Sequence, residues 1–239
     1  NGVMADVSDM YEGEALQPMD CITFKDAGVP VGYSSSNEIL ILYYNKDMFD
    51  AANKPYPSAD TPYTWDEFVE VAKRLTFDDA GKHPGEEGFN PEKIVQYGAF
   101  VNNWTWQMEV WALSNGGAWF SEDGNEVLIN SPEAIEAMEF VQTMYKEGIL
   151  TSDPTSEDWG SGFTQLGTGA AAMYIGANDA VAQPTAYNGL AVDKLMMAPI
   201  PAGPRGDQHS LMGGTPYFFA NNATEDEINA ALNYLEIMG

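Results

Sequence analysis

The feature that most constrains this 239-residue chain is a short apolar run, Ile39–Tyr44, which follows a polar, serine-rich approach, Gly32–Glu38. The run is too short for a free-standing helix and is rich in β-branched and aromatic side chains, so we expect a strand buried on both faces. Strands of this kind belong to α/β sheets that carry helices on both sides. Asn45 follows the run and suits the cap of a helix.

The balance of charges excludes one class of partner. The chain has 10 Lys and Arg against 36 Asp and Glu, which gives a formal net charge of −26. A protein of this charge repels polyanions at ordinary salt, so we expect no nucleic-acid partner. The acidity fits either a high-salt habitat or an ordinary extracellular protein of an acid-rich lineage. Melting temperatures in dilute buffer and in molar salt would separate the two, because salt screens charge repulsion.

Composition also favours folded domains. Hydrophobic residues make up 44% of the chain, which is enough for one or two cores at this length. The single cysteine, Cys21, excludes an intrachain disulfide and a cysteine-rich zinc site. It fits a small buried side chain, and a reactive thiol is the alternative. No apolar run reaches the roughly 18 residues of a membrane span, and the first residues do not resemble a signal peptide, so we expect the sequence to begin inside a longer protein.

Capping signals and apolar periodicity predict the order of the elements. Thr64–Glu67 has the spacing of a capping box before a helical pattern, and Thr224–Glu227 repeats it. Ser131, followed by a proline and an acid, begins another helix that Gly148 ends. The remaining expected elements are an aromatic helix over 104–113 stopped by 115–117, a helical turn over 163–169, and strands over 95–101, 170–175 (which could instead be helical), 194–200 and 217–220.

Two stretches are expected to be rich in loops. Residues 1–31 show no strong period, although short helical pieces could form around 7–11, and residues 77–93 are polar and broken by glycines and prolines. The second stretch holds several acids, but their spacing does not match the alternating oxygen ligands of a calcium loop. We therefore expect a solvated surface loop there.

Short motifs spread over nearly the whole chain resemble one family. In chain order they are Gly32-Tyr33, Leu42–Asp47, Thr64–Phe68, Asn115–Gly117, Ser131–Glu133, Gly169–Gly176, Ala198–Pro201 and Gly213-Gly214. Their order resembles the extracellular solute-binding proteins that serve ABC sugar importers, the family that includes the maltose-binding protein. The resemblance implies an α/β fold of the two-lobed periplasmic-binding-protein type (type II), whose lobes close on a mono- or oligosaccharide.

The same resemblance implies a division into domains. Residues 1–36 would be part of the N-terminal lobe with the first crossing strand, 37–212 a C-terminal α/β lobe, and 213–239 the return crossing with more of the N-terminal lobe. The family's opening strands and closing helices have no counterpart in this sequence. We therefore expect a chain truncated at both ends, with one lobe nearly complete and the other partial.

Aromatic and amide side chains gather in one segment. Trp104, Trp106 and Trp111 lie close in sequence to Asn102 and Asn103. Carbohydrate C–H faces stack on aromatic rings, and sugar hydroxyls need both hydrogen-bond donors and acceptors, so the segment fits a sugar site. The alternative is that these tryptophans pack in the core.

The resemblance adds ligand contacts at other positions. It implies an acidic contact at Glu38, for which the alternative is a solvated acid at a strand end. It also places Asp179 where many sugar-binding relatives have a tryptophan, which suggests a more polar or differently shaped ligand. The expected ligand-binding residues are Tyr33, Ser35, Asn37, Glu38, Asn103, Trp104, Trp106, Asn178, Asp179, Gly214, Thr215 and Tyr217.

No catalytic signature accompanies these residues. The sequence lacks the Gly-x-Ser-x-Gly, His-Glu-x-x-His and phosphate-binding Gly/Lys motifs, so we expect no catalytic residue, no cofactor and no metal. The resemblance implies a carbohydrate ligand and ABC permease subunits as partners. It also implies an extracellular location, either periplasmic or as a cell-surface lipoprotein whose lipid anchor lies outside this chain. The alternatives are a glycoside hydrolase and a surface carbohydrate-adhesion module.

Overall fold

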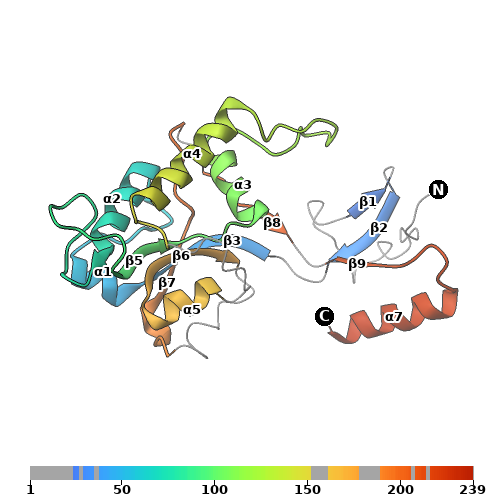
Figure 1. Cartoon of the computed structure of the whole chain (residues 1–239). Coiled ribbons are helices and arrows are strands. Elements are labelled where there is room, and N and C mark those ends of the chain that lie inside the picture. The colour runs from blue at the N-terminus through green and yellow to red at the C-terminus, as the bar shows by residue number, and fades with distance from the viewer. Residues whose placement is uncertain are drawn as a thin grey trace. The chain divides into compact units, whose positions relative to one another are not determined.

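The computed structural model describes residues 24–26, 29–34, 38–151, 161–177, 189–205, 208–213 and 216–238. The chain divides into two compact units (Figure 1). Unit 1 comprises residues 1–38 and 212–239, and unit 2 comprises residues 39–211. Each unit is described by itself below.

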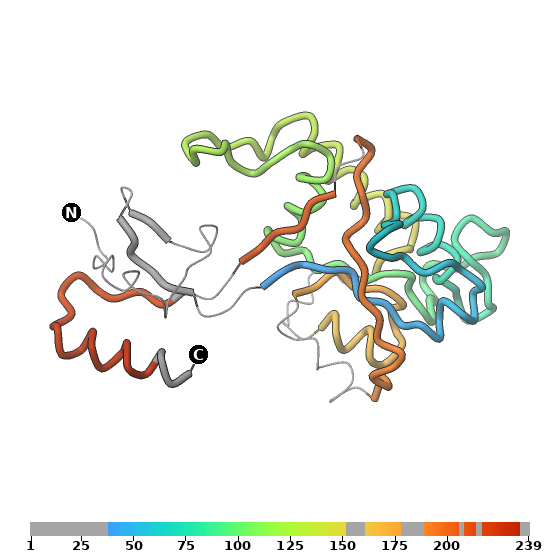
Figure 2. Tube along the Cα trace, turned by 180° about the vertical axis from the view of Figure 1, so that it is seen from behind, coloured from blue at the N-terminus to red at the C-terminus, as the bar shows by residue number. Residues whose placement is uncertain are grey.

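Unit 2 is organised around a mixed β-sheet. Its strands have the order β4-β5-β6-β3-β7, in which β5 and β6 are parallel and the other neighbours are antiparallel. The strand that leads into the unit, β3, therefore lies between two partners from the second half of the chain (Figure 2). The bounds are β3 (Glu38–Asn45), β4 (Phe77–Asp78), β5 (Ile94–Phe100), β6 (Ala171–Ala177) and β7 (Leu195–Ala198).

Strand β3 is buried on both faces, as predicted from the apolar run. Leu40, Leu42 and Tyr44 belong to the larger of two hydrophobic clusters. Tyr43 points to the opposite face and belongs to the smaller cluster, where its ring lies 5.2 Å from that of Phe163. Because successive side chains of a strand alternate between faces, one short run supplies both cores.

Helices cover the two faces of this sheet unequally. The first four contribute buried residues to the larger cluster, and α5 contributes to the smaller one, so the unit has three layers with α5 on the opposite side of the sheet (Figure 1). A single turn of 3₁₀-helix over Val192–Lys194 precedes β7. The helix bounds are α1 (Lys46–Ala52), α2 (Trp65–Leu75), α3 (Thr105–Ser114), α4 (Pro132–Lys146) and α5 (Ser161–Thr168).

The helix starts in this unit follow the predicted capping residues. The Asn45 side chain accepts a hydrogen bond from the Asp47 backbone at 3.1 Å and begins α1. Thr64 and Glu67 form the reciprocal capping box, with backbone donations of 3.2 Å and 2.8 Å. Ser131 accepts from the first turn of α4. These local signals are confirmed, and so is the strand at β6, where a helix was the alternative.

The expectation of a simple solvated loop over 77–93 is wrong in part. Asp78 ends the short strand β4 and is 2% exposed. Its carboxylate accepts backbone hydrogen bonds from Ala80 at 2.9 Å, Lys82 at 2.8 Å and Asn90 at 2.8 Å. A buried carboxylate needs such donors in place of water, so this side chain organises the loop from within.

Unit 1 contains a three-stranded antiparallel sheet of order β1-β2-β9 and a C-terminal helix. The expectation of a loop over 1–31 is wrong for its described part, because β1 and β2 lie there. The strand β2 pairs with β9, a segment that is remote in sequence, and local periodicity does not reveal such pairing. The bounds are β1 (Phe24–Asp26), β2 (Val29–Ser34), β8 (Met212–Gly213), β9 (Pro216–Phe218) and α7 (Glu225–Met238), and α7 begins with the predicted Thr224–Glu227 capping box.

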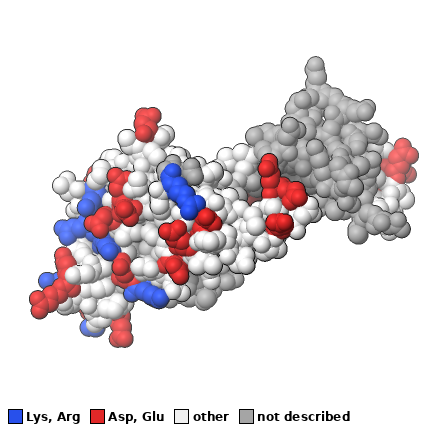
Figure 3. All heavy atoms as spheres, turned by 90° about the horizontal axis from the view of Figure 1, so that it is seen from above, with Lys and Arg blue, Asp and Glu red and all other residues white. Residues whose placement is uncertain are grey.

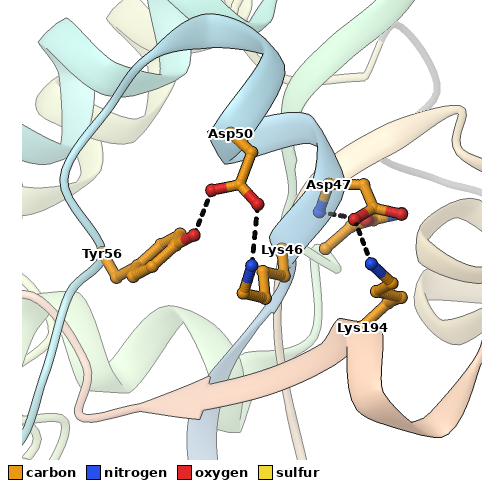
Figure 4. A network of polar contacts seen from close by, with 6 residues as sticks. Lys46, Asp47, Asp50, Tyr56 and Lys194 are labelled. Carbon is orange, nitrogen blue, oxygen red and sulfur yellow. Dashed lines mark hydrogen bonds and ion pairs between the residues drawn. The ribbon is translucent and has the colours of Figure 1, made fainter.

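Several of the scarce basic side chains of unit 2 are paired with acids. Figure 3 shows basic and acidic side chains interspersed over one face of this unit, at the left of the view. Close to the start of α1, Lys46 pairs with Asp50 at 2.7 Å, Tyr56 donates to the same carboxylate, and Lys194 pairs with Asp47 at 2.6 Å (Figure 4). These side chains reach the solvent, so water and salt screen the ion pairs and each pair stabilises the fold only weakly.

Candidate functional site

The register of the sheet in unit 2 brings three chain segments to one edge. Leu40, near the start of β3, lies opposite Ala177 at the end of β6. Phe100, the last residue of β5, lies opposite Tyr174 in the parallel pair. The start of β3 and the ends of β5 and β6 therefore meet at the same edge, which we call the strand-end edge. In open α/β sheets, ligands bind outside strand ends of this kind.

The three tryptophans of the aromatic segment have different environments. Trp111 is 0% exposed and belongs to the core. Trp106 is half-buried and packs against that core. Trp104, also half-buried, is the N-cap residue of α3 and makes no capping hydrogen bond with its side chain. Because an indole is a donor only, it cannot accept from the first turn of a helix. The Trp104 side chain therefore does not cap α3.

Asn103 and Glu38 are the other predicted residues that the structure describes near strand ends of the central sheet. Asn103 is exposed and directly precedes Trp104 after the end of β5. Glu38 is the half-buried first residue of β3. In unit 1, Tyr33 of β2 lies opposite Tyr217 of β9 in the ladder, and the Tyr217 side chain is 40% exposed.

Six predicted residues lie outside the described part of the chain. Two of them directly follow Ala177, the last residue of β6, and therefore follow the strand-end edge in sequence. The six are Ser35, Asn37, Asn178, Asp179, Gly214 and Thr215.

A buried polar cluster beneath the strand-end edge was missed from the sequence. The Gln107 side chain of α3 is 1% exposed and donates to Asn102 Oδ1 at 3.2 Å, to the Ile175 carbonyl at 3.2 Å and to the Tyr174 hydroxyl at 3.4 Å. Asn102 donates in turn to Ser161 at 3.4 Å. The cluster ties the loop after β5 to β6 and α5. The available signal was a glutamine between Trp106 and Met108 in an aromatic helix.

The same amide leaves one atom without a partner. Gln107 Oε1 is buried and accepts no hydrogen bond from the described residues. An unsatisfied buried acceptor costs about 1–3 kcal/mol. The hydrogen bonds of the Gln107 amide nitrogen must therefore offset the cost of the unpaired oxygen. The same hydrogen bonds orient the segment that carries Asn103 and Trp104.

The described residues contain neither a cluster of metal ligands nor a helix that could span a membrane. Among those residues, no group of three or more His, Cys, Asp or Glu side chains gathers as metal ligands would. None of the described helices has both the length and the apolar character required to cross a bilayer.

Comparison with known proteins gives several curated relatives at low identity. One is a protein of Deinococcus radiodurans named a probable ABC transporter-binding protein, 25% identical over 182 residues, a match that covers 73% of this chain and 39% of the relative. Another is a protein of Brucella abortus named a putative binding protein, 26% identical over 241 residues, with 96% of this chain and 52% of the relative covered. The chain therefore spans about half the length of the curated relatives that it matches.

Solved structures are similar over nearly the whole chain. Maltose-bound MalE3 of T. maritima superposes with a TM-score of 0.76 at 22% identity, covering 99% of this chain and 57% of that one. A solute-binding protein of Agrobacterium radiobacter in complex with ribitol gives a TM-score of 0.76 at 21% identity, with 99% and 57% covered. The fold is therefore that of the two-lobed periplasmic binding proteins, of which this chain spans somewhat more than half.

The sequence of residues 3–236 matches the model of one protein family. That match includes the buried strand, the capped helices and the strand-end edge described above. The chain belongs to the family of bacterial extracellular solute-binding proteins.

Proposed function

We propose that this protein binds an extracellular carbohydrate between two lobes and delivers it to the permease subunits of an ABC importer. The observation that carries the proposal is the segment Asn103-Trp104, which places an exposed amide and a half-buried indole together at the strand-end edge. An aromatic face and a hydrogen-bonding side chain are two elements that suit a sugar ring. The protein would act in the periplasm or on the cell surface as a lipoprotein, and as a binding protein rather than an enzyme.

Two further observations support the proposal, one on the class of ligand and one on how the site is held in place. The similar structures from T. maritima and Agrobacterium radiobacter hold maltose and ribitol, a sugar and a sugar alcohol without charge. The buried contacts of Gln107 hold the loop that carries Asn103 and Trp104 against β6. A site held in place before the ligand arrives binds more tightly, because less conformational freedom is lost on binding.

The experiment that tests the function is a panel of mono- and oligosaccharides added to a protein long enough to supply both lobes. A specific sugar at 100 times its Kd should stabilise the folded state by about 2.7 kcal/mol, which raises the melting temperature. No shorter sugar should appear on chromatography. Release of product would favour the hydrolase alternative, and the absence of any stabilisation across the panel would count against the proposal.

Glu38→Gln is expected to weaken sugar binding by about 1–3 kcal/mol, because a buried polar contact to a ligand hydroxyl would be mismatched. The melting temperature without ligand should stay within about a degree, since Glu38 is the first residue of β3 and lies outside the core clusters. Isothermal titration calorimetry measures the first quantity and a thermal scan the second. An unchanged affinity would assign Glu38 to the solvated acids at strand ends.

Substitution of Trp104 and of Trp106 by alanine should separate ligand contact from packing. Trp106 packs against the larger core, so Trp106→Ala should lower the free energy of unfolding. Trp104→Ala should instead lower the sugar affinity by roughly 1 kcal/mol or more, the worth of one stacked ring, with a smaller loss of stability. Calorimetry and urea unfolding of both variants give the comparison. Equal stability losses with unchanged affinities would place both rings in the core.

A further inference from the structure

A pocket lies between α3 and α4, beside the segment that carries Asn103 and Trp104. Its volume is about 220 Å³. We call it the α3–α4 pocket. It is lined by Asn103, Met108, Met138, Val141, Gln142 and Tyr145.

The lining of the α3–α4 pocket combines an apolar floor with an amide rim. Met108 and Val141 are buried, and Met138 is half-buried, so they form the floor. Asn103 and Gln142 are exposed at the rim. Thioether side chains adapt to irregular shapes, and amides offer both donors and acceptors.

Only some of the polar atoms around the α3–α4 pocket form hydrogen bonds with other described residues. The Tyr145 hydroxyl donates to the Val101 carbonyl at 2.7 Å, so this tyrosine offers mainly its ring to the pocket. The Gln142 Oε1 atom accepts from Lys146 at 2.6 Å, which leaves the Gln142 Nε2 hydrogens as donors. Burial raises the pKa of Tyr145, so its phenol stays neutral.

None of the six lining residues is charged at neutral pH, although the chain as a whole carries a formal net charge of −26. A neutral lining favours a neutral ligand, because a charged one would lose hydration without gaining a counter-charge. The volume also limits the occupant. Sites for drug-sized ligands begin at about 300 Å³, so this pocket has room for a single ring or a small substituent.

We propose that the α3–α4 pocket is a subsite that receives one further ring of a neutral oligosaccharide whose first ring lies against Trp104. Asn103 lines the pocket and directly precedes Trp104, so one amide adjoins both positions. The inference rests on the proposed carbohydrate function and narrows the ligand to a sugar of at least two units.

The test is NMR of the 239-residue chain with labelled methionine methyl groups and labelled tryptophan indoles. The chain is titrated with glucose, maltotriose, xylose and xylotriose. Shift titrations detect weak, millimolar binding. One of the trisaccharides should shift the Met108 and Met138 methyl signals and the Trp104 indole signal together. The matching monosaccharide should shift the indole alone. Signals are assigned with Met108→Leu, Met138→Leu and Trp104→Phe.

Two variants and one control sharpen the result. Gln142→Ala removes an exposed amide and should weaken trisaccharide binding by roughly three- to tenfold while leaving the monosaccharide unaffected. Met138→Trp should fill the pocket and give the same pattern. Thr143→Ala is the matched control, because Thr143 is exposed on the same helix and lines a different pocket.

The outcomes separate this inference from the function on which it rests. A trisaccharide that shifts the Trp104 indole but neither methionine would overturn the subsite and leave carbohydrate binding in place. A monosaccharide that shifts the two methionines without the indole would also overturn it, because the pocket would then act alone. If no sugar shifts any of the three signals, the subsite fails, and the sugar panel on a protein that supplies both lobes decides the proposed function separately.

Discussion

Trp111→Ala is expected to lower the free energy of unfolding by about 3–5 kcal/mol, the usual range for removal of a fully buried large aromatic side chain. Trp111 is 0% exposed, and its ring centroid lies 5.7 Å from those of Trp65, Phe68 and Phe140. Alanine would leave a cavity among these rings, which α2 and α4 hold in place. Because domains are stable by only about 5–15 kcal/mol, the loss is a large share of the total. Urea unfolding followed by circular dichroism measures it.

Trp111→Phe provides the control for this prediction. The Trp111 Nε1 atom is buried and donates no hydrogen bond to the described residues. Phenylalanine removes that unsatisfied donor and keeps a ring in the cluster, so it should cost clearly less than alanine. If both variants lost the same free energy, the indole N–H would have a partner that stabilises it. If Trp111→Ala cost less than about 1 kcal/mol, Trp111 would not hold the core together.

Gly98→Ala is expected to destabilise unit 2 by about 3 kcal/mol or more, at the upper end of the range for overpacking. A Cβ atom at Gly98 would lie 2.1 Å from the Ala72 carbonyl oxygen and 2.6 Å from its carbon, both in the backbone of α2. The Gly98 N–H also donates to Thr76 Oγ1 at 2.8 Å, and Thr76 Oγ1 donates to the Ala72 carbonyl at 2.8 Å. A methyl group would push α2 off β5 and break these buried hydrogen bonds.

Gly124→Ala is the matched control for the close approach at Gly98. Gly124 has a φ of 70°, and a Cβ atom there would meet nothing within 4 Å. Its substitution should therefore cost only the left-handed conformation, roughly 1–2 kcal/mol. Urea unfolding of both variants gives the comparison. A Gly98→Ala variant as stable as Gly124→Ala would show that α2 can move away from β5 without loss.

The elements that were predictable from the sequence are those whose cause is local. The continuous apolar run Ile39–Tyr44 is enough to bury both faces of β3, and the hydroxyl and carboxylate of Thr64 and Glu67 lie within one helical turn. Strand β2 was missed because its partner β9 is remote in sequence. Asp78 was taken for a solvated acid because the acceptor role of its carboxylate depends on a loop that closes twelve residues later, at Asn90.

The candidate site shows the same limit. The aromatic and amide character of Asn103 and Trp104 is visible in the sequence, since residue type alone indicates stacking and hydrogen bonding. The role of Gln107 is not, because its partners Tyr174 and Ile175 come from the other half of the chain. The α3–α4 pocket was missed for a similar reason. Helical periodicity places Met138 and Val141 on a buried face but does not show that a gap lies between them and α3.

The position of β3 in its sheet has a consequence for synthesis on the ribosome. Tyr43 donates a hydrogen bond to Ala177, which is 134 residues later in the chain. At roughly 5–20 residues per second, translation needs about 7–27 seconds to supply that partner. Contacts between such distant residues also fold slowly. During this interval the apolar strand has neither of its neighbours, so the nascent chain exposes an aggregation-prone edge that a chaperone would have to cover.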